Sequence, residues 1–172
     1  MTRIPAFIAP ALGVALAACT STPQLPAAPA ELAPPAGEVL VLAALARGVQ
    51  TYECTTDGAT GYQWRFKGPE ARLVDRGGRD LGKHYPGPTW EAPDGSKVVA
   101  ELRSQVKSPD ADAIPLLLLK ARSTSGSGMF ANVRSIQRLD TVGGRAPAAT
   151  CSRENFAALA RIPYTATYYF YR

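Results

Sequence analysis

The sequence predicts a mainly β protein, a compact antiparallel sandwich or barrel of about eight to nine strands with one short helix near residues 152–161. Runs that alternate apolar and polar residues recur along the chain. Turn signals such as Gly77-Gly78 and Asp94-Gly95 separate these runs, and only one segment is a good helix candidate with a typical N-cap residue. Many short strands with regular turns are typical of a sandwich or a barrel.

The first two expected strands lie in "EVLVLAALARGVQTYECT", which reads as two β-rich runs that meet near Arg47-Gly48, although "VLAALA" alone could equally start a helix. In the second run, Gln50, Tyr52 and Cys54 share one face because alternate residues of a strand point the same way. We expect this face to be turned inward.

The next expected strand is "GYQWRFKGP", which has the strongest alternation in the chain. Tyr62, Trp64 and Phe66 lie on one face and charged or amide side chains lie on the other. This period of two predicts a half-buried strand with its aromatic residues inward.

The later strands are expected on both sides of Gly77-Gly78 and then at four further runs. These runs are "KVVAELRSQV", "LLLLKAR", "MFANVRSIQRLDTVGG" and "YTATYYFYR". "LLLLKAR" begins with an unbroken apolar run, which predicts a strand covered on both faces. "SRENFAALAR" is the one helix candidate, because Ser152 is a typical N-cap residue.

The N-terminus has the layout of a secretory signal peptide over residues 1–18, with Arg3 before an apolar stretch that ends in small residues. Leu16 to Cys19 resembles the lipobox of bacterial lipoproteins. The resemblance implies cleavage before Cys19 and a lipid on its thiol, which would anchor the protein to a membrane. The alternative is an ordinary signal peptide cleaved near Ala18, with Cys19 incidental.

The residues after the lipobox predict which membrane holds the lipid anchor. By resemblance to enterobacterial lipoproteins, Thr20 and Ser21 stand where an aspartate would favour the inner membrane. This favours the periplasmic face of the outer membrane. Residues 19–37 then comprise the lipidated cysteine and an extended tether rich in Pro and Ala, followed by a single β-rich domain over residues 38–172.

Charge argues against a nucleic-acid partner. The chain has 19 Lys and Arg against 14 Asp and Glu, a net charge of +5. The cations are scattered singly, and an exported protein rarely meets nucleic acid. The partners that remain are the membrane, through the lipid anchor, and an envelope ligand or protein; no cofactor is expected.

Cys54 and Cys151 are left as a pair once Cys19 is lipidated, and exported proteins usually join such a pair. The alternative is two free or metal-binding thiols. The chain has one histidine and no closely spaced cysteine pair, too few ligands for a zinc site.

The closest approach to a chemical motif is "GKHYPGPTWEAPDGS", which holds the single histidine. A hydrolase would use His84 with Ser96 and Asp94, or a pair of carboxylates drawn from Glu91, Asp94 and Glu101. The segment lacks the strained glycine-flanked serine of many such enzymes, and Asp-Gly is also what a hairpin turn requires. We assign no catalytic residue.

Two other interpretations of this motif stay open. His84, Tyr85 and Trp90 could line a recess, because ligand clefts combine aromatic side chains with a few polar groups. Alternatively, Trp90 belongs to the core and His84 bonds a backbone carbonyl, so that the segment is scaffold. We favour the scaffold interpretation.

Several motifs resemble the landmarks of an uncharacterised family of secreted proteins found in bacteria and fungi. They include "GVQTYEC", "GKHYPGPTWE", "SIQRLDTVGGRAP" and "PYTATYYFY", and the resemblance spans nearly all of residues 38–172. It implies no activity. One departure is Leu116, where the resemblance leads us to expect a tryptophan. We therefore expect a lipid-anchored envelope domain with a binding or structural role, with an envelope hydrolase using His84 as the alternative.

Overall fold

The computed structural model describes residues 25–56, 58 and 61–172, in which eight antiparallel strands form one closed barrel in sequence order. The strands are β1 (Leu40–Thr56), β2 (Tyr62–Val74), β3 (Asp80–Tyr85), β4 (Thr89–Glu91), β5 (Lys97–Val106), β6 (Leu116–Ser125), β7 (Ser135–Gly143) and β8 (Leu159–Tyr171). Two short 3-10 turns are η1 (Ala30–Leu32) and η2 (Arg153–Asn155). The predicted mainly β class is confirmed, and the barrel decides between the two expected architectures.

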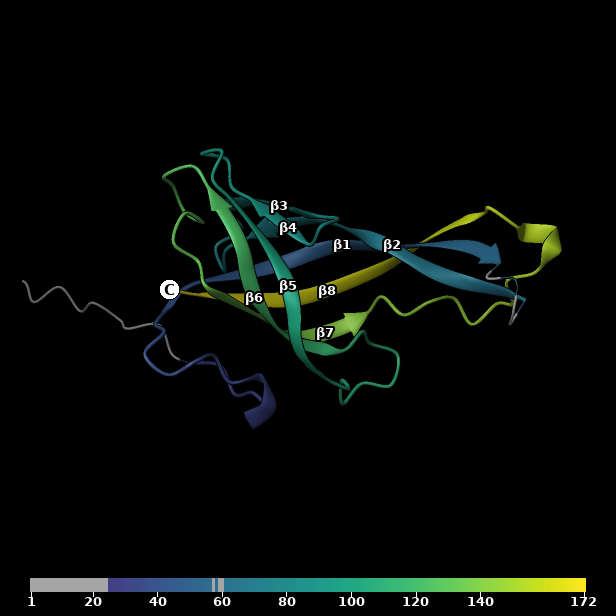
Figure 1. Cartoon of the computed structure of the whole chain (residues 1–172), viewed down its shortest axis with the longest axis horizontal. Helices are drawn as coiled ribbons and strands as arrows, with labels where there is room; N and C mark the ends of the chain where they lie inside the picture. Colours follow the sequence, from purple (N-terminus) through teal and green to yellow (C-terminus); the bar gives the residue numbers. More distant parts are fainter. Residues whose placement is uncertain (1–24, 57, 59–60) are drawn as a thin grey trace, which may run out of the picture.

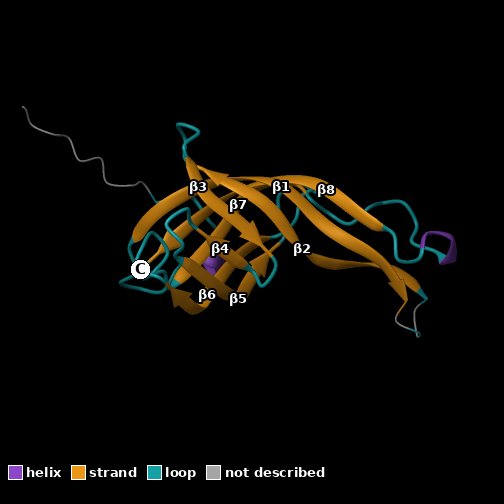
Figure 2. Cartoon of the chain, turned by 90° about the horizontal axis from the view of Figure 1, so that it is seen from above, coloured by secondary structure: helices purple, strands orange, loops and turns teal. Residues whose placement is uncertain are grey.

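The barrel closes because β1 pairs with β2 along one edge and with β8 along the other. Each remaining strand pairs with its neighbours in sequence, so the sheet winds once around a shared interior (Figure 2). Closure leaves no unpaired strand edge in this part of the sheet.

Three strands run on past the barrel and form an arm, which projects to one side of it in Figure 1. Residues 62–70 of β2 and residues 159–163 of β8 pair with β1 alone among the described strands. We define these two ranges, with residues 49–56 of β1, as the arm.

The arm corrects one prediction. The strand predicted from Tyr62 to Phe66 is present, but Tyr62 is 40% exposed and Phe66 is 50% exposed. The alternation is that of an inward face, but the arm has no opposite barrel wall to cover that face. The rings pack instead against close neighbours, Tyr62 against Phe156 and Phe66 against Tyr52.

A second correction concerns β1, which is one continuous strand of 17 residues rather than two runs meeting near Arg47-Gly48. Gly48 does not break the strand; it permits close approach of β2. A Cβ atom at Gly48 would lie 2.0 Å from the Glu70 carbonyl oxygen and 2.5 Å from Ala71 Cα. Glycine therefore stands where β1 and β2 cross too closely for any side chain.

The barrel interior is filled by aliphatic and aromatic side chains from all around the sheet. Its largest fully buried members are Trp90, Tyr168, Phe130 and Phe170. Several of the rings contact one another edge-on, as between Trp90 and Phe170 with centroids 6.1 Å apart.

β6 is covered on both faces, as "LLLLKAR" predicts. Leu117 and Leu119 belong to the interior core, whereas Leu116 and Leu118 form a second cluster with Leu32 of η1. Leu116, the residue that departs from the expected tryptophan, therefore packs outside the barrel.

Residues 30–32 correct the prediction of an extended tether up to residue 37. They form η1, and Leu32 is fully buried against the outer face of the sheet. Gln137 Nε2 donates to the Leu32 carbonyl and Ser104 Oγ donates to the Glu31 carbonyl. The packed part of the protein therefore begins before residue 38.

The helix expected near residues 152–161 is the fourth correction. Ser152 caps a turn as predicted, but the turn is η2, a single 3-10 turn. Past it, the Ala157 N–H donates to the Cys54 carbonyl and the Cys54 N–H donates to the Ala158 carbonyl, and β8 begins at Leu159. Pairing with β1 outweighs the local helix propensity of this segment.

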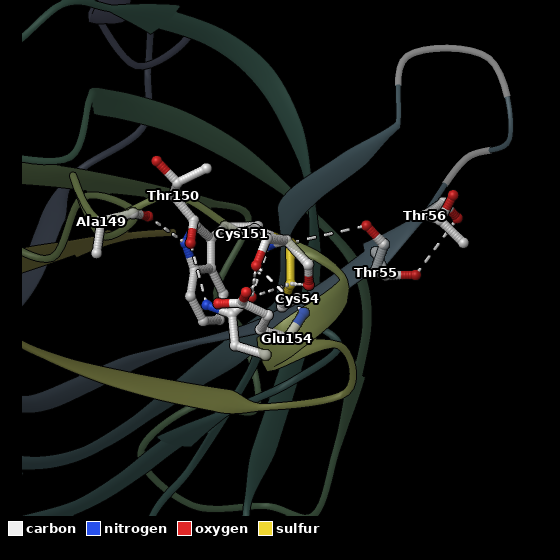
Figure 3. Close-up of a disulfide and its surroundings, with 10 residues drawn as sticks. Cys54, Thr55, Thr56, Ala149, Thr150, Cys151 and Glu154 are labelled. Carbon is white, nitrogen blue, oxygen red and sulfur yellow. Dashed lines mark hydrogen bonds between the residues drawn. A yellow bond between two sulfur atoms is a disulfide. The ribbon is translucent and has the colours of Figure 1, made fainter.

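Cys54 and Cys151 form a disulfide, with their Cα atoms 5.4 Å apart, which confirms the predicted pairing. Figure 3 shows that it joins the end of β1 to the loop that leads into η2. Beside it, the indole of Trp64 donates to the Ala149 carbonyl. The bond therefore fastens the arm at its outer end.

Within the residues described, no helix is long and apolar enough to cross a membrane.

We predict that Gly48→Ala lowers the free energy of unfolding by about 1–3 kcal/mol, the usual cost of forcing an extra methyl into a packed site. Urea unfolding of the two proteins measures it. The matched control is Gly77→Ala in the β2–β3 turn, where φ is not positive and the nearest atom is a side-chain oxygen 3.3 Å away. It should change stability by less than about 0.5 kcal/mol; equal effects at both positions would contradict the close approach at Gly48.

Candidate ligand-binding site

The segment "GKHYPGPTWEAPDGS" forms the β3–β4 hairpin and the turn into β5. His84 and Trp90 are cross-strand partners, and their rings stack with centroids 4.3 Å apart. Tyr168 of β8 meets both rings edge-on, at 5.0 Å and 5.3 Å. A cross-strand pair on one face of a hairpin places both rings inside the barrel.

His84 is held in one protonation state. Its Nδ1 lies 2.9 Å from the Thr89 carbonyl oxygen, so Nδ1 carries the proton and donates, which leaves Nε2 as an acceptor. Burial lowers the pKa of His84 to about 3; the hydrogen bond to Thr89 opposes this shift and the charge of Arg138 adds to it. With Trp90 fully buried, both features expected of a scaffold role are present.

Tyr85 lies apart from His84 and Trp90, as alternation along β3 requires. Its hydroxyl donates to Glu91 Oε2 at 2.7 Å, and the Lys83 ammonium lies 5.6 Å from its ring centre. The hydrogen bond from Tyr85 lowers the pKa of Glu91. The structure therefore brings together two of the three recess residues and places the third outside.

The residues considered for hydrolysis are occupied elsewhere. Ser96 is fully buried and its Oγ accepts from the Phe130 backbone, while Asp94 accepts from the backbones of Ser96 and Met129. Glu91 lies within 4 Å of two lysine ammonium groups. No hydrogen bond links His84 to a serine or an acid within the described ranges, so the geometry gives the hydrolase hypothesis no support.

Among the described residues, no group of three or more His, Cys, Asp or Glu side chains is placed to hold a metal ion.

His84 and Trp90 line a half-open cavity of about 570 Å³ where the arm meets the barrel. The arm contributes Gln50, Tyr52 and Phe66, and β5 contributes Leu102. Phe66 and Leu102 are exposed and stand at the opening, whereas Gln50 and Tyr52 are buried. The cavity is thus an apolar recess whose inner end lies in the barrel core.

The inner end also holds polar groups without partners. Gln50 Nε2, Trp90 Nε1 and the Tyr168 hydroxyl are buried and make no hydrogen bond of normal geometry with a described residue, although Gln50 and Tyr168 both lie close enough to the Tyr164 hydroxyl to affect its pKa. Tyr168 is close enough to the Arg138 guanidinium for that group to lower its pKa, against the larger effect of burial, but no bond of normal length joins them. Buried polar atoms are nearly always hydrogen-bonded in folded proteins, so these three mark a place where a partner fits.

Sequence reasoning missed Arg138 and Tyr168, and it noted Gln50 only as an inward residue. One signal was available: Arg138 shares a strand face with Ile136 in "SIQRLD", and an arginine on an inward face needs a reason. Cys19, the predicted lipidation site, lies outside the described residues.

A family model described as a protein of unknown function (DUF3455) matches residues 35–172. The chain belongs to this family. Neither a curated protein nor a solved structure matches this chain. Membership confirms the resemblance to an uncharacterised family; the signal peptide and the lipid anchor stay predictions.

In this DUF3455 domain we predict that the single imidazole, observed by NMR, shows no titration midpoint between pH 5 and pH 8. Because the folded pKa lies below the unfolded value of about 6.5, the unfolded chain binds more protons. The free energy of unfolding therefore decreases as the pH is lowered from 8 to 5, by up to about 1.4 kcal/mol per pH unit.

The control is His84→Asn, whose amide can replace the Nδ1 donor and does not titrate. Urea unfolding at pH 7.5 and pH 5 should show a smaller pH dependence than in the unaltered DUF3455 domain. His84→Ala should cost about 1–3 kcal/mol, because the Thr89 carbonyl loses its donor. An imidazole midpoint near pH 6.5 would contradict the buried neutral histidine.

Proposed function

We propose that this chain is an exported, lipid-anchored binding protein whose barrel takes up a small, mainly apolar ligand at the cell envelope. The observation that carries the proposal is the half-open cavity, with its exposed apolar opening and its unpartnered polar atoms at the inner end.

The cavity has the character of a ligand site rather than of a packing defect. Its volume of about 570 Å³ is within the range of small-molecule sites, and most lining residues are apolar. Closed eight-stranded barrels have an interior that side chains fill or that holds one small ligand. Here Trp90 and its neighbours fill one part of the interior and the cavity occupies the rest.

The anchor is supported by the lipobox-like Leu16 to Cys19 and by the disulfide, which belongs to an oxidising compartment. A lipid at Cys19 would hold the binding domain beside a membrane, where apolar ligands concentrate.

We expect phenylnaphthylamine, a neutral apolar dye, to gain fluorescence in the cavity and to saturate with one site per chain. Leu117→Trp should weaken this binding at least about tenfold, because the larger ring occupies cavity space at a half-buried lining position. The measurement is a fluorescence titration of the full chain carrying Cys19→Ser, so that its own acyl chains do not compete.

The control variant is Val142→Trp, which adds the same ring at a position that is 58% exposed and does not line the cavity. Its dye affinity should equal that of the parent chain. If Leu117→Trp binds the dye as tightly as Val142→Trp does, the dye site is elsewhere and the proposed binding function fails.

For the anchor, we expect Cys19→Ser to move the protein from the membrane fraction to the soluble fraction of cell envelopes, since the serine hydroxyl cannot take the thioether-linked lipid. Cell fractionation with labelling by an acyl-chain probe measures both changes. A Thr20→Ser variant, altered at the next position, should stay in the membrane fraction and keep its label. Retention of the Cys19→Ser chain on membranes would rule out the lipid anchor.

A further inference from the structure

Arg138 is a half-buried cation on the wall of the cavity. No carboxylate of the described residues lies within ion-pair distance of its guanidinium. The other cation on the cavity wall, Lys67, is exposed at the opening and is paired with Glu53 at 2.8 Å. A partly buried charge without a counter-charge is costly, so Arg138 is the unbalanced group of this site.

Arg138 uses one edge of its guanidinium on Pro115; the other edge makes no hydrogen bond of normal geometry, and the Tyr168 hydroxyl lies near the guanidinium. Nε and Nη2 both donate to the Pro115 carbonyl, at 3.1 Å and 2.8 Å. Three of the five N–H donors of an arginine are then left, on the adjacent nitrogens Nη1 and Nη2. Two donors on adjacent nitrogens match the two oxygens of one carboxylate.

The positive charge of Arg138 reaches the whole inner end of the cavity. Burial raises the pKa of Tyr52, Tyr164 and Tyr168, and Arg138 opposes this rise in all three. His84 stays neutral and contributes no charge. No acidic side chain lines the cavity among the described residues.

Gln50 is the second donor of the site. It is 1% exposed, lines the cavity, and its Nε2 makes no hydrogen bond of normal geometry, with the Tyr164 hydroxyl as a nearby group. An amide N–H₂ on the wall of the same cavity as Arg138 adds a further donor for an acceptor group bound there.

We propose that the ligand is an amphipathic carboxylic acid, whose carboxylate binds the free edge of Arg138 with help from Gln50 and whose hydrocarbon part lies along the apolar wall. This assignment rests on the proposed binding function. One unpaired cation favours a single negative charge, because a dianion would carry an uncompensated charge into a largely apolar recess.

The test compares octanoate with octanol, which have the same chain length and differ in charge. Each displaces phenylnaphthylamine from the full chain carrying Cys19→Ser. We expect octanoate to bind at least about tenfold more tightly than octanol. In Arg138→Met this preference should be lost, while the affinity for octanol stays the same.

The matched control is Lys67→Met, which removes the other cation of the cavity wall and should keep the preference. Because Arg138→Met also removes two hydrogen bonds to Pro115, Arg138→Lys is measured beside it. Lysine keeps the charge but not the two-point contact, so an intermediate preference is expected.

The outcomes separate the two proposals. Equal affinity for octanoate and octanol overturns the carboxylate assignment and leaves the binding function standing. If the preference for octanoate disappears in Lys67→Met but survives in Arg138→Met, the carboxylate is recognised at the opening of the cavity. This result also overturns the assignment to Arg138. If neither compound displaces the dye, the carboxylate assignment fails, while the dye titration of Leu117→Trp still decides the binding function.

Discussion

Closure of the sheet through β1 is the constraint on which the rest of the structure depends. Because β1 pairs with β2 and β8 at once, inward side chains from all strands share one interior. Rings such as Trp90 and Phe170 fill part of that space. β1, β2 and β8 then continue as the arm, whose inner face bounds the remaining space and makes it a cavity. The recess is therefore a product of closure and of strands longer than the barrel needs.

Within this recess, a polar group that is hydrogen-bonded to the protein serves the scaffold, and a polar group without such a bond is available to a ligand. His84 and Trp90 lie side by side, yet His84 bonds Thr89 and stays neutral, whereas the Trp90 indole N–H bonds no described residue. Arg138 donates two hydrogen bonds to the Pro115 carbonyl from one edge of its guanidinium, and the other edge makes no hydrogen bond of normal geometry. A buried donor left without an acceptor costs stability, so the barrel gives up some stability at these positions in favour of an occupant.

The sequence predicts what depends on neighbours along the chain and misses what depends on closure. β5 was expected over residues 97–106, where it lies, because alternation between two turns is local. The predicted helix near 152–161 was wrong, and Tyr62 and Phe66 are more exposed than predicted, since pairing of β8 with β1 and the length of the arm are not local properties. The site divides in the same way. His84 and Trp90 sit in one hairpin, whereas Arg138 and Tyr168 reach it only through closure of the barrel.

The disulfide makes oxidation a check on strand register. Side chains alternate along a strand, so a slip of β1 by one residue turns every side chain to the other face of the sheet. Such a slip would carry Cys54 away from Cys151, which lies 97 residues later and on a different part of the chain. In the register observed, the 5.4 Å between their Cα atoms is within the range that a disulfide requires. A register that separated the two cysteines beyond this range would leave two free thiols, so formation of the bond reports correct closure of the barrel.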